Sequence, residues 1–346
     1  MKNIAYFFIA AIGIVVTLIF GKALLIPFIF ALLLWFIVKE IRAGIDKIGF
    51  IEKYVPSWIK SLLTTVVILS ILGFISKILS ASINTLAKSY PKYESNVDAI
   101  IESANEMFSL DLVSLVQGHS ADIDFGSILG SLFNSLTDIL SSAFMITLYA
   151  LFIFLEEANF RTKLKSVFSS KEKFEQVYNI LNTIEVSISK YLTLKTFVSL
   201  ITGVLSYVAL AIIGIDSPIF WALIIFIFNF IPTVGSLAGT LFPAVFCLLQ
   251  FGEFGPALLV LSIVGVIQIL VGNILEPKLM GNSMNLSPLV SILALSLWGA
   301  LWGVTGMILS IPITVIMVII CSQFEATKSV AIMLSEKGEI NKNDKI

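Results

Sequence analysis

Long apolar runs separated by short charged stretches dominate the chain. A helix needs about 20 apolar residues to cross the hydrocarbon core of a bilayer, with a lower limit near 17. The uninterrupted runs cover residues 4–20, 23–38, 61–83, 132–155, 196–214 and 257–275. Two further apolar stretches, 219–250 and 289–321, are interrupted by glycine and proline. The pattern predicts an all-α polytopic membrane protein with about 7–8 membrane segments, two of them broken or re-entrant, plus amphipathic helices in the loops.

The two interrupted stretches carry the strongest functional signal. In the first, the apolar run 219–231 is about 20 Å of helix, which is too short for a core about 30 Å thick, and Pro232 ends it. In the second, the segment WGALWGVTG and Pro312 break a run that is too long for one straight crossing. Each is a kinked span or a pair of half-helices meeting inside the membrane. Backbone that leaves the helix at membrane depth needs burial or a wet cavity, so its unpaired groups are expected to receive a solute.

Polar stretches between the runs predict the topology. Residues 84–131 are acidic and residues 156–195 are basic, and both show helical periodicity. Lysine and arginine favour cytoplasmic loops, so 39–60 and 156–195 face inward, 84–131 faces outward, and both termini are cytoplasmic. The expected parts are N-terminal membrane helices 1–83, an extracytoplasmic amphipathic loop 84–131, a core 132–322 that includes the cytoplasmic amphipathic helix 156–195, and a cytoplasmic tail 323–346.

Composition narrows the class of protein. The chain has 346 residues, of which 58% are hydrophobic and 13% charged, whereas soluble chains are about half apolar and a quarter charged. A net charge of −1 argues against a nucleic-acid partner. Cys247 and Cys321 lie in apolar runs, and His119 has no second histidine or cysteine nearby, so we expect no metal and no cofactor. No serine, histidine and acid converge on an apolar run, so we do not expect an enzyme.

Uncharged polar side chains gather near the two breaks and would suit a neutral, hydroxyl-rich solute. The alternative is that glycine and proline only let helices pack closely. The predicted substrate pathway consists of Asn229, Pro232, Thr233, Gly235, Ser236, Gln268, Asn273, Glu276, Pro277, Gly281, Gly303, Thr305, Gly306 and Pro312.

Two acids are candidates for ion or proton coupling, because charges inside membrane segments are costly and often functional. Asp138 lies in the first turns of the run 132–155, where it pairs with Lys77 or reaches the interface. Glu276 follows the run 257–275, where it is part of the pathway or a rim charge paired with Lys278.

Several segments resemble a known family. FNFIPTVGS, LFPAVF and QILVGNILEPKLMGNSMNLSPLVSILALSLWGALWGVTGMILSIPITV, preceded by LYALFIFLEE and YLTLKT, are similar to the signature of the autoinducer-2 exporter family of bacterial membrane transporters. The resemblance covers the chain from about Leu132 to Ser322. It implies a bacterial inner-membrane permease with cytoplasmic termini, re-entrant hairpins, elevator-like movement and homo-oligomers, with a pentamer as the expected form.

The resemblance also implies a choice of substrate. Family members are linked to export of autoinducer-2, a small polyhydroxylated furanone, or to sodium/proton exchange. Many members carry an acid where this chain has Val271, and an aromatic residue and a proline where it has Thr233 and Ser236. The first hypothesis is therefore an exporter of a small polar or polyhydroxylated metabolite such as autoinducer-2. The alternatives are a Na⁺ or Li⁺/proton antiporter, which the valine disfavours, and a non-transporting membrane scaffold, which leaves the broken helices unexplained.

Overall fold

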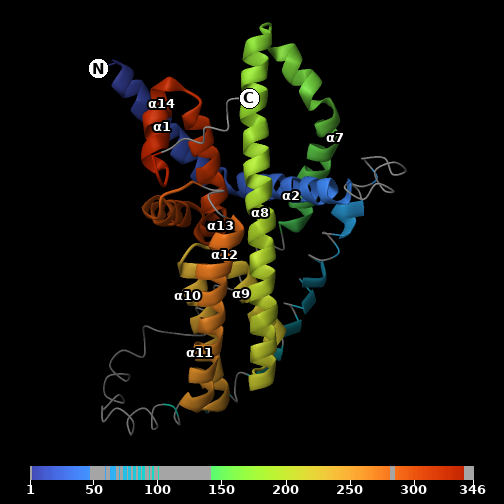
Figure 1. Ribbon diagram of the computed structural model, residues 1–346, viewed down its shortest axis with the longest axis vertical. Coiled ribbons are helices and arrows are strands. Elements are labelled where there is room, and N and C mark those ends of the chain that lie inside the picture. Colours follow the sequence, from blue (N-terminus) through green and yellow to red (C-terminus); the bar gives the residue numbers. More distant parts are fainter. Residues whose placement is uncertain are drawn as a thin grey trace. The chain divides into compact units, whose positions relative to one another are not determined.

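The computed structural model describes residues 2–46, 142–280 and 285–338, with scattered positions between 59 and 100 (Figure 1). Within these ranges every regular element is a helix. Five helices are long and apolar enough to cross a membrane, or six if the two straight stretches of the bent helix α7 count as one span. The predicted all-α membrane architecture is confirmed. The run 61–83 is helical at every described position, whereas Asp138, His119 and Gly281 lie outside the described residues.

The chain divides into two compact units. The first unit comprises Met1–Ser70, Ile139–Leu194 and Asn282–Ile346, and the second comprises Ile71–Asp138 and Lys195–Gly281. Each unit therefore combines segments that are far apart in the sequence.

The first unit is built around a packed pair of helices. Helices α2 (Lys22–Asp46) and α7 (Ala143–Val167) enclose a small apolar core, and the rings of Phe28 and Tyr149 meet edge to face at 5.9 Å. The unit also contains α1 (Lys2–Phe20), the first part of α8 (Lys171–Ile213), α13 (Pro288–Ser322) and α14 (Glu325–Leu334).

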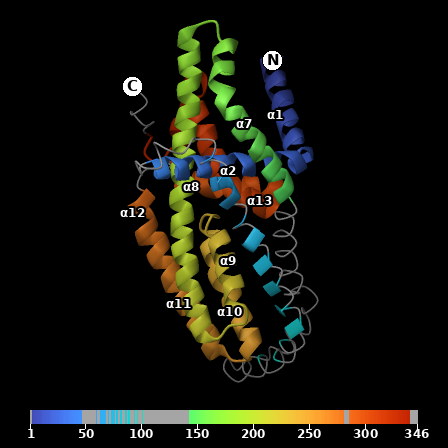
Figure 2. The ribbon, with the colours of Figure 1, turned by 90° about the vertical axis from the view of Figure 1, so that its right-hand side faces the viewer.

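The second unit contains the last part of α8 and a run of shorter helices (Figure 2). These are α9 (Pro218–Phe228), α10 (Val234–Phe251) and α11 (Phe254–Leu270), which continues through a π-helical turn, η1 (Val271–Leu275), into α12 (Glu276–Met280). Helix α10 packs against both α9 and α11. The helical segment thus extends beyond the apolar run 257–275, because Glu276–Met280 is helical.

Helix α8 differs from the expected organisation. The sequence predicts an amphipathic helix over 156–195 and a separate span over 196–214, but α7 continues to Val167 and α8 then runs unbroken from Lys171 to Ile213 (Figure 1). No proline lies between these two residues, so nothing ends the helix where the charges end. At 43 residues α8 is about 65 Å long, twice the hydrocarbon thickness.

The break at Pro232 is a tight hairpin between α9 and α10, which we call the first hairpin. A Cβ added to Gly235 would lie 1.8 Å from the carbonyl oxygen of Phe228, although residues seven apart in a continuous helix are separated by about 10 Å. Gly239 lies against Ile225 in the same way, so α10 returns alongside α9. The kinked-span alternative is thereby ruled out at this break.

The second break, in α13, is also a fold-back, which we call the second hairpin. Gly303 leaves the helical conformation with φ 62° and ψ −142°, and a Cβ on Gly306 would lie 1.9 Å from the carbonyl oxygen of Trp298. A straight helix separates residues eight apart by about 12 Å. Both predicted interruptions are therefore present.

Free main-chain groups were the expected attraction for a solute at these breaks. In the first hairpin, however, the amides of Asn229, Phe230, Ile231 and Gly235 donate to carbonyls three or four residues earlier, at 2.8–3.1 Å. That expectation is wrong for these four amides, because the turn satisfies them internally. Any site must depend on side chains and on other backbone groups.

Candidate functional site

Buried polar side chains mark the interior of the second unit. Asn229, at the end of α9, is 7% exposed, and its Nδ2 donates to the Oγ1 of Thr202 on α8 at 3.4 Å. The Thr202 hydroxyl in turn donates to the carbonyl oxygen of Val198 at 3.0 Å. Close approach of α8 and α9 is possible because Gly203 lies beside the carbonyl of Ala222. The predicted pathway residue Asn229 is thus held by a hydroxyl that the sequence pattern did not single out.

A second buried amide has no partner among the described residues. The Nε2 of Gln268 on α11 is inaccessible to solvent and makes no hydrogen bond, and it lies 3.2 Å from where a Cβ of Gly239 would be. The carbonyl of Gly239 also lacks its α-helical donor, because residue 243 is a proline without an N–H. The Gln268 amide therefore faces Gly239 of α10 without a hydrogen-bond partner among the described residues.

An ion pair lies in the same unit. Lys195 of α8 and Glu276 of α12 form a direct salt bridge, and their side chains are only 9% and 19% exposed. The pairing with Lys278 that was one alternative for Glu276 is not the one found. Lys278 is exposed, as are Asn273 and Pro277, whereas Val271 is buried.

A hydrogen-bonded network ties the start of α9 to the end of α10. The Gln250 side chain accepts from the amide of Asp216 at 2.6 Å and donates to the carbonyl of Gly214 at 2.9 Å. Tyr93 donates to Asp216 at 2.7 Å, and Asn96 donates to the carbonyls of Leu249 and Gln250, each at 2.9 Å. Burial and the hydrogen bond to Asp216 raise the pKa of Tyr93 to about 12, so this hydroxyl stays protonated and remains a donor. This network closes the two ends of the hairpin together.

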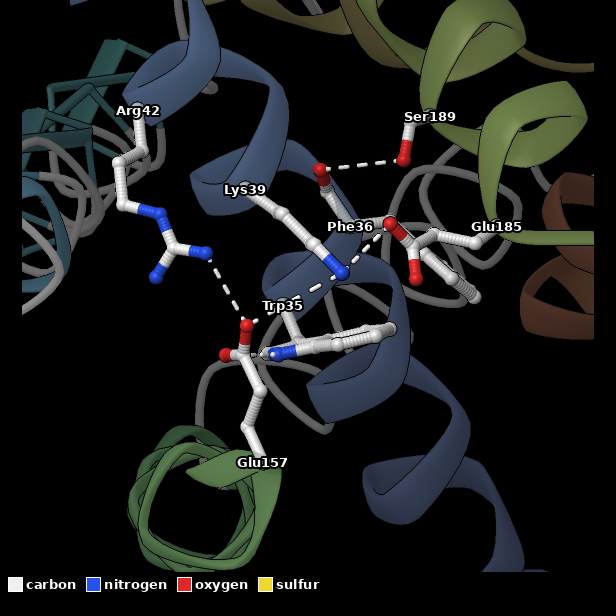
Figure 3. Close-up of polar contacts among 7 residues, drawn as sticks. All are labelled: Trp35, Phe36, Lys39, Arg42, Glu157, Glu185 and Ser189. Carbon is white, nitrogen blue, oxygen red and sulfur yellow. Dashed lines mark hydrogen bonds and ion pairs between the residues drawn. The ribbon is translucent and has the colours of Figure 1, made fainter. Parts of the chain in front are cut away.

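The first unit has a charged cluster of its own, which joins α2, α7 and α8 (Figure 3). Lys39 contacts Glu185 at 2.5 Å and Glu157 at 4.0 Å, and Arg42 contacts Glu157 at 3.0 Å. The indole of Trp35 donates to Glu157 at 2.8 Å and also lies under the Lys39 ammonium, 4.9 Å from the ring centre. Two cations thus balance two carboxylates, and the cluster fastens three helices to one another.

Hydroxyl groups at both hairpins serve the turns themselves. Ser236 donates to the carbonyl of Thr233 at 2.9 Å, and Thr305 donates to the carbonyl of Trp302 at 2.6 Å. Pro312 and Gly306 are buried in the first unit, whereas Thr233 and Gly303 are exposed. The predicted pathway residues therefore belong to two units. In the second unit, Asn229, Gly235 and Gln268 are buried, and Pro232, Ser236 and Glu276 are half-buried.

Several polar residues of the interior were missed from the sequence. Lys195, Ser199, Thr202 and Ser206 follow one another at positions i, i+4, i+7 and i+11 of α8, which places them on one helix face. All four are at most 7% exposed. Their spacing within an apolar run is a signal that could have been found. Glu157 and Lys39 were counted only as loop charges, because the extent of α2 and α7 was underestimated.

The fold is that of a polytopic helical membrane protein in which hairpins interrupt the apolar helices and polar groups are buried beside them. This architecture is typical of a solute transporter. The chain belongs to the AI-2E transporter family, because the family model described as "AI-2E family transporter" matches residues 7–326.

Individual relatives agree with this assignment. "AI-2 transport protein TqsA" of Escherichia coli K12 is 30% identical over 322 residues, which cover 92% of this chain and 91% of the relative. A Borreliella burgdorferi protein named "Putative transport protein" is 33% identical, over 73% of this chain and 70% of its own length. YueF of Bacillus subtilis is 25% identical over 86% of this chain and 83% of its own. The protein is therefore a membrane transporter.

Proposed function

We propose that the chain exports a small, neutral, hydroxyl-rich metabolite, with autoinducer-2 as the example suggested by the name of the E. coli relative. The observation that carries the proposal is the buried, unpartnered amide of Gln268, which faces Gly239 of α10. A hydroxyl oxygen accepts hydrogen bonds, so a hydroxyl group of a solute can accept from Nε2. An unpaired polar group buried in an apolar setting costs about 1–3 kcal/mol, which such a solute would offset.

The setting of the proposed site favours an uncharged solute. The buried polar side chains near the first hairpin include the amides and hydroxyls of Asn229, Thr202, Thr240 and Gln268. The charged pair Lys195–Glu276 is neutral as a whole. A charged solute would find no free counter-charge among these side chains, and an unpaired buried charge is costly. In this proposal the activity of the chain is transport and not catalysis.

The proposal places the chain in the bacterial inner membrane with both termini in the cytoplasm, on the basis of the lysine-rich stretches 39–60 and 156–195. It also includes assembly into homo-oligomers, with a pentamer as the form that the resemblance implies. Exposed apolar side chains along the last part of α8, including Phe197, Leu200, Val204 and Val208, support contact with lipid or with a second copy.

A monovalent cation/proton antiporter is the second candidate, and Glu276 favours it because it is a half-buried acid within the candidate span Phe254–Met280. Two observations rank it lower. The carboxylate already has Lys195 as its partner, and the buried position 271 holds valine. A non-transporting scaffold ranks third, because it gives the buried unpartnered amide no purpose.

The test is the substitution Gln268→Leu in proteoliposomes loaded with autoinducer-2. We expect efflux to fall about five- to tenfold, the equivalent of one lost hydrogen bond to the solute. Thermal stability should stay unchanged or rise, because the substitution removes an unpaired buried amide. Gln176→Leu, the same change at an exposed position of α8, serves as the control. Wild-type vesicles that release the solute no faster than empty ones would refute the export function, and unchanged efflux from Gln268→Leu would refute the site.

A further inference from the structure

Stabilisation of the fold does not by itself explain the buried Lys195–Glu276 ion pair. Taking two charges out of water costs several kcal/mol for each ion, and replacing a buried pair by apolar residues of similar volume is often neutral or stabilising. At 9% and 19% exposure, these side chains have lost most of their hydration. An apolar pair would thus hold α8 against α12 at least as well, and the charges need another explanation.

The backbone before Glu276 is arranged to aim this residue. The amide of Glu276 donates to the carbonyl of Val271, the i→i−5 bond of a π-turn, and Val271–Leu275 form the π-helix η1. A π-turn inserts one residue into a helix, so the residues after it are rotated by about 100° relative to a continuous α-helix. Such turns are rare and are often found at functional sites. Here the turn sets the direction in which the Glu276 carboxylate leaves α12.

Oxygen atoms continue from the lysine along α8. Ser199 lies one turn beyond Lys195 on the same face of α8. It is 0% exposed, and its hydroxyl has no hydrogen-bond partner in the part of the chain that the structure describes. A carboxylate with nearby hydroxyl oxygens is the ligand chemistry of a hard cation. Glu276 and Ser199 therefore offer oxygen atoms of the kind that bind a small cation, and the Lys195 ammonium is the cation found at the carboxylate.

We infer that the Lys195 ammonium occupies a monovalent-cation site formed by the Glu276 carboxylate and the Ser199 hydroxyl of α8. The tethered cation keeps the carboxylate neutralised at all times, so a neutral solute crosses without a coupling ion. This inference rests on the proposed export function for its transport consequence, but the cation site itself can be tested without any solute.

The test removes the tethered cation and supplies a free one. In Lys195→Gln, Na⁺ should bind at Glu276, so the melting temperature of the purified full-length protein should rise with NaCl and not with equal choline chloride. Solute efflux from this variant should rise about tenfold between 1 and 100 mM NaCl if the dissociation constant is about 10 mM. Wild type and Lys195→Arg should respond to neither salt.

Two controls isolate the site. Lys195→Gln/Glu276→Gln removes both charges and should lose the response to Na⁺. Lys163→Gln breaks an ion pair with Glu156 whose side chains are 62% and 50% exposed, and it should gain no response. If Lys195→Gln does not fold without salt, the yield of monodisperse protein is compared in NaCl and choline chloride, and recovery only in NaCl supports the site.

Three results would overturn the inference. These are a folded Lys195→Gln variant indifferent to Na⁺ in both melting and efflux, equal yields of that variant in the two salts, and a wild type whose efflux requires Na⁺. Absence of any solute efflux from wild type would instead refute the export function, because the melting measurement would still report whether the cation site exists.

Discussion

The first and second hairpins follow one plan with different chemistry. Each starts at a Ser-Pro pair, 217–218 or 287–288, and places a proline in its second arm, at 243 or 312. Each brings a glycine under a carbonyl of the first arm. The turns differ, because the first uses Thr233 at φ 59°, whereas the second uses Gly303 at φ 62°. The surroundings differ too, since buried amides lie near the first and Trp298 and Trp302 at the second.

This difference separates what a fold-back requires from what a site requires. Proline sets φ for the first turn of an arm, and glycine admits a carbonyl where a Cβ would collide, so both hairpins need them. The indole of Trp302 anchors the second hairpin to the carbonyl of Leu18 at 2.9 Å. The first hairpin instead holds a β-branched residue at positive φ, a strained conformation of the kind that gathers at functional sites. The strain and the unpartnered amide therefore occur in the same unit.

The largest expected effect is a collapse of either hairpin when its close-packed glycine gains a side chain. Gly235→Val and Gly306→Val would place Cβ 1.8 and 1.9 Å from a carbonyl oxygen, so the arms must separate. We expect a loss above about 4 kcal/mol and little monodisperse protein in detergent size-exclusion chromatography. Gly255→Ala, where nothing lies within 4 Å of the added Cβ, should behave as wild type. A well-folded Gly235→Val would show that the shared plan is dispensable.

Substitutions at the two turn residues, Gly303 and Thr233, should have intermediate effects on stability, and the two effects should be opposite in sign. Gly303→Ala forces alanine into a conformation nearly reserved for glycine and should cost about 1–3 kcal/mol. Thr233→Gly relieves comparable strain, against which the added freedom of the unfolded chain counts for about 0.4–1 kcal/mol, so this variant should be more stable. Melting temperatures of the two variants decide the matter. If Thr233→Gly melts lower, the first turn is not strained.

Much of this fold is predictable from periodicity and from breakers. The positions of Pro232 and Gly303 predict both interruptions, and the apolar runs 4–20, 219–231 and 257–275 predict α1, α9 and α11 to within five residues. The length of α8 is not predictable in this way, because a helix that passes from water into lipid changes its composition without any signal that ends it. The π-turn before Glu276 was equally hidden, since no residue type specifies one.

The candidate site was predictable only in part. Asn229 and Gln268 stand out in the sequence as amides within apolar runs, and both are buried. Their surroundings cannot be read from the sequence, because Thr202, which bonds Asn229, and Gly239, which lies beside Gln268, are on other helices and their approach depends on tertiary packing. The same limit applies to Glu276, for which Lys278 was the nearby candidate and Lys195 is the partner. Ser236 and Thr305 were selected for polarity, yet their hydroxyls bond within their own turns.

The smallest effects on stability are expected on removal of the Ser236 and Thr305 hydroxyls, and they bear most directly on the comparison of the two hairpins. Ser236→Ala and Thr305→Ala each remove one hydrogen bond to a turn carbonyl and should each cost about 0.5–1.5 kcal/mol of stability. Thr305→Ser keeps the hydroxyl and is the control for the lost methyl group. If both hydroxyls serve only the turns, efflux per folded molecule should be unchanged in both alanine variants. A fall in efflux confined to Ser236→Ala would mean that the first hairpin offers this hydroxyl to the solute during transport, and the two hairpins would then differ in function as well as in chemistry.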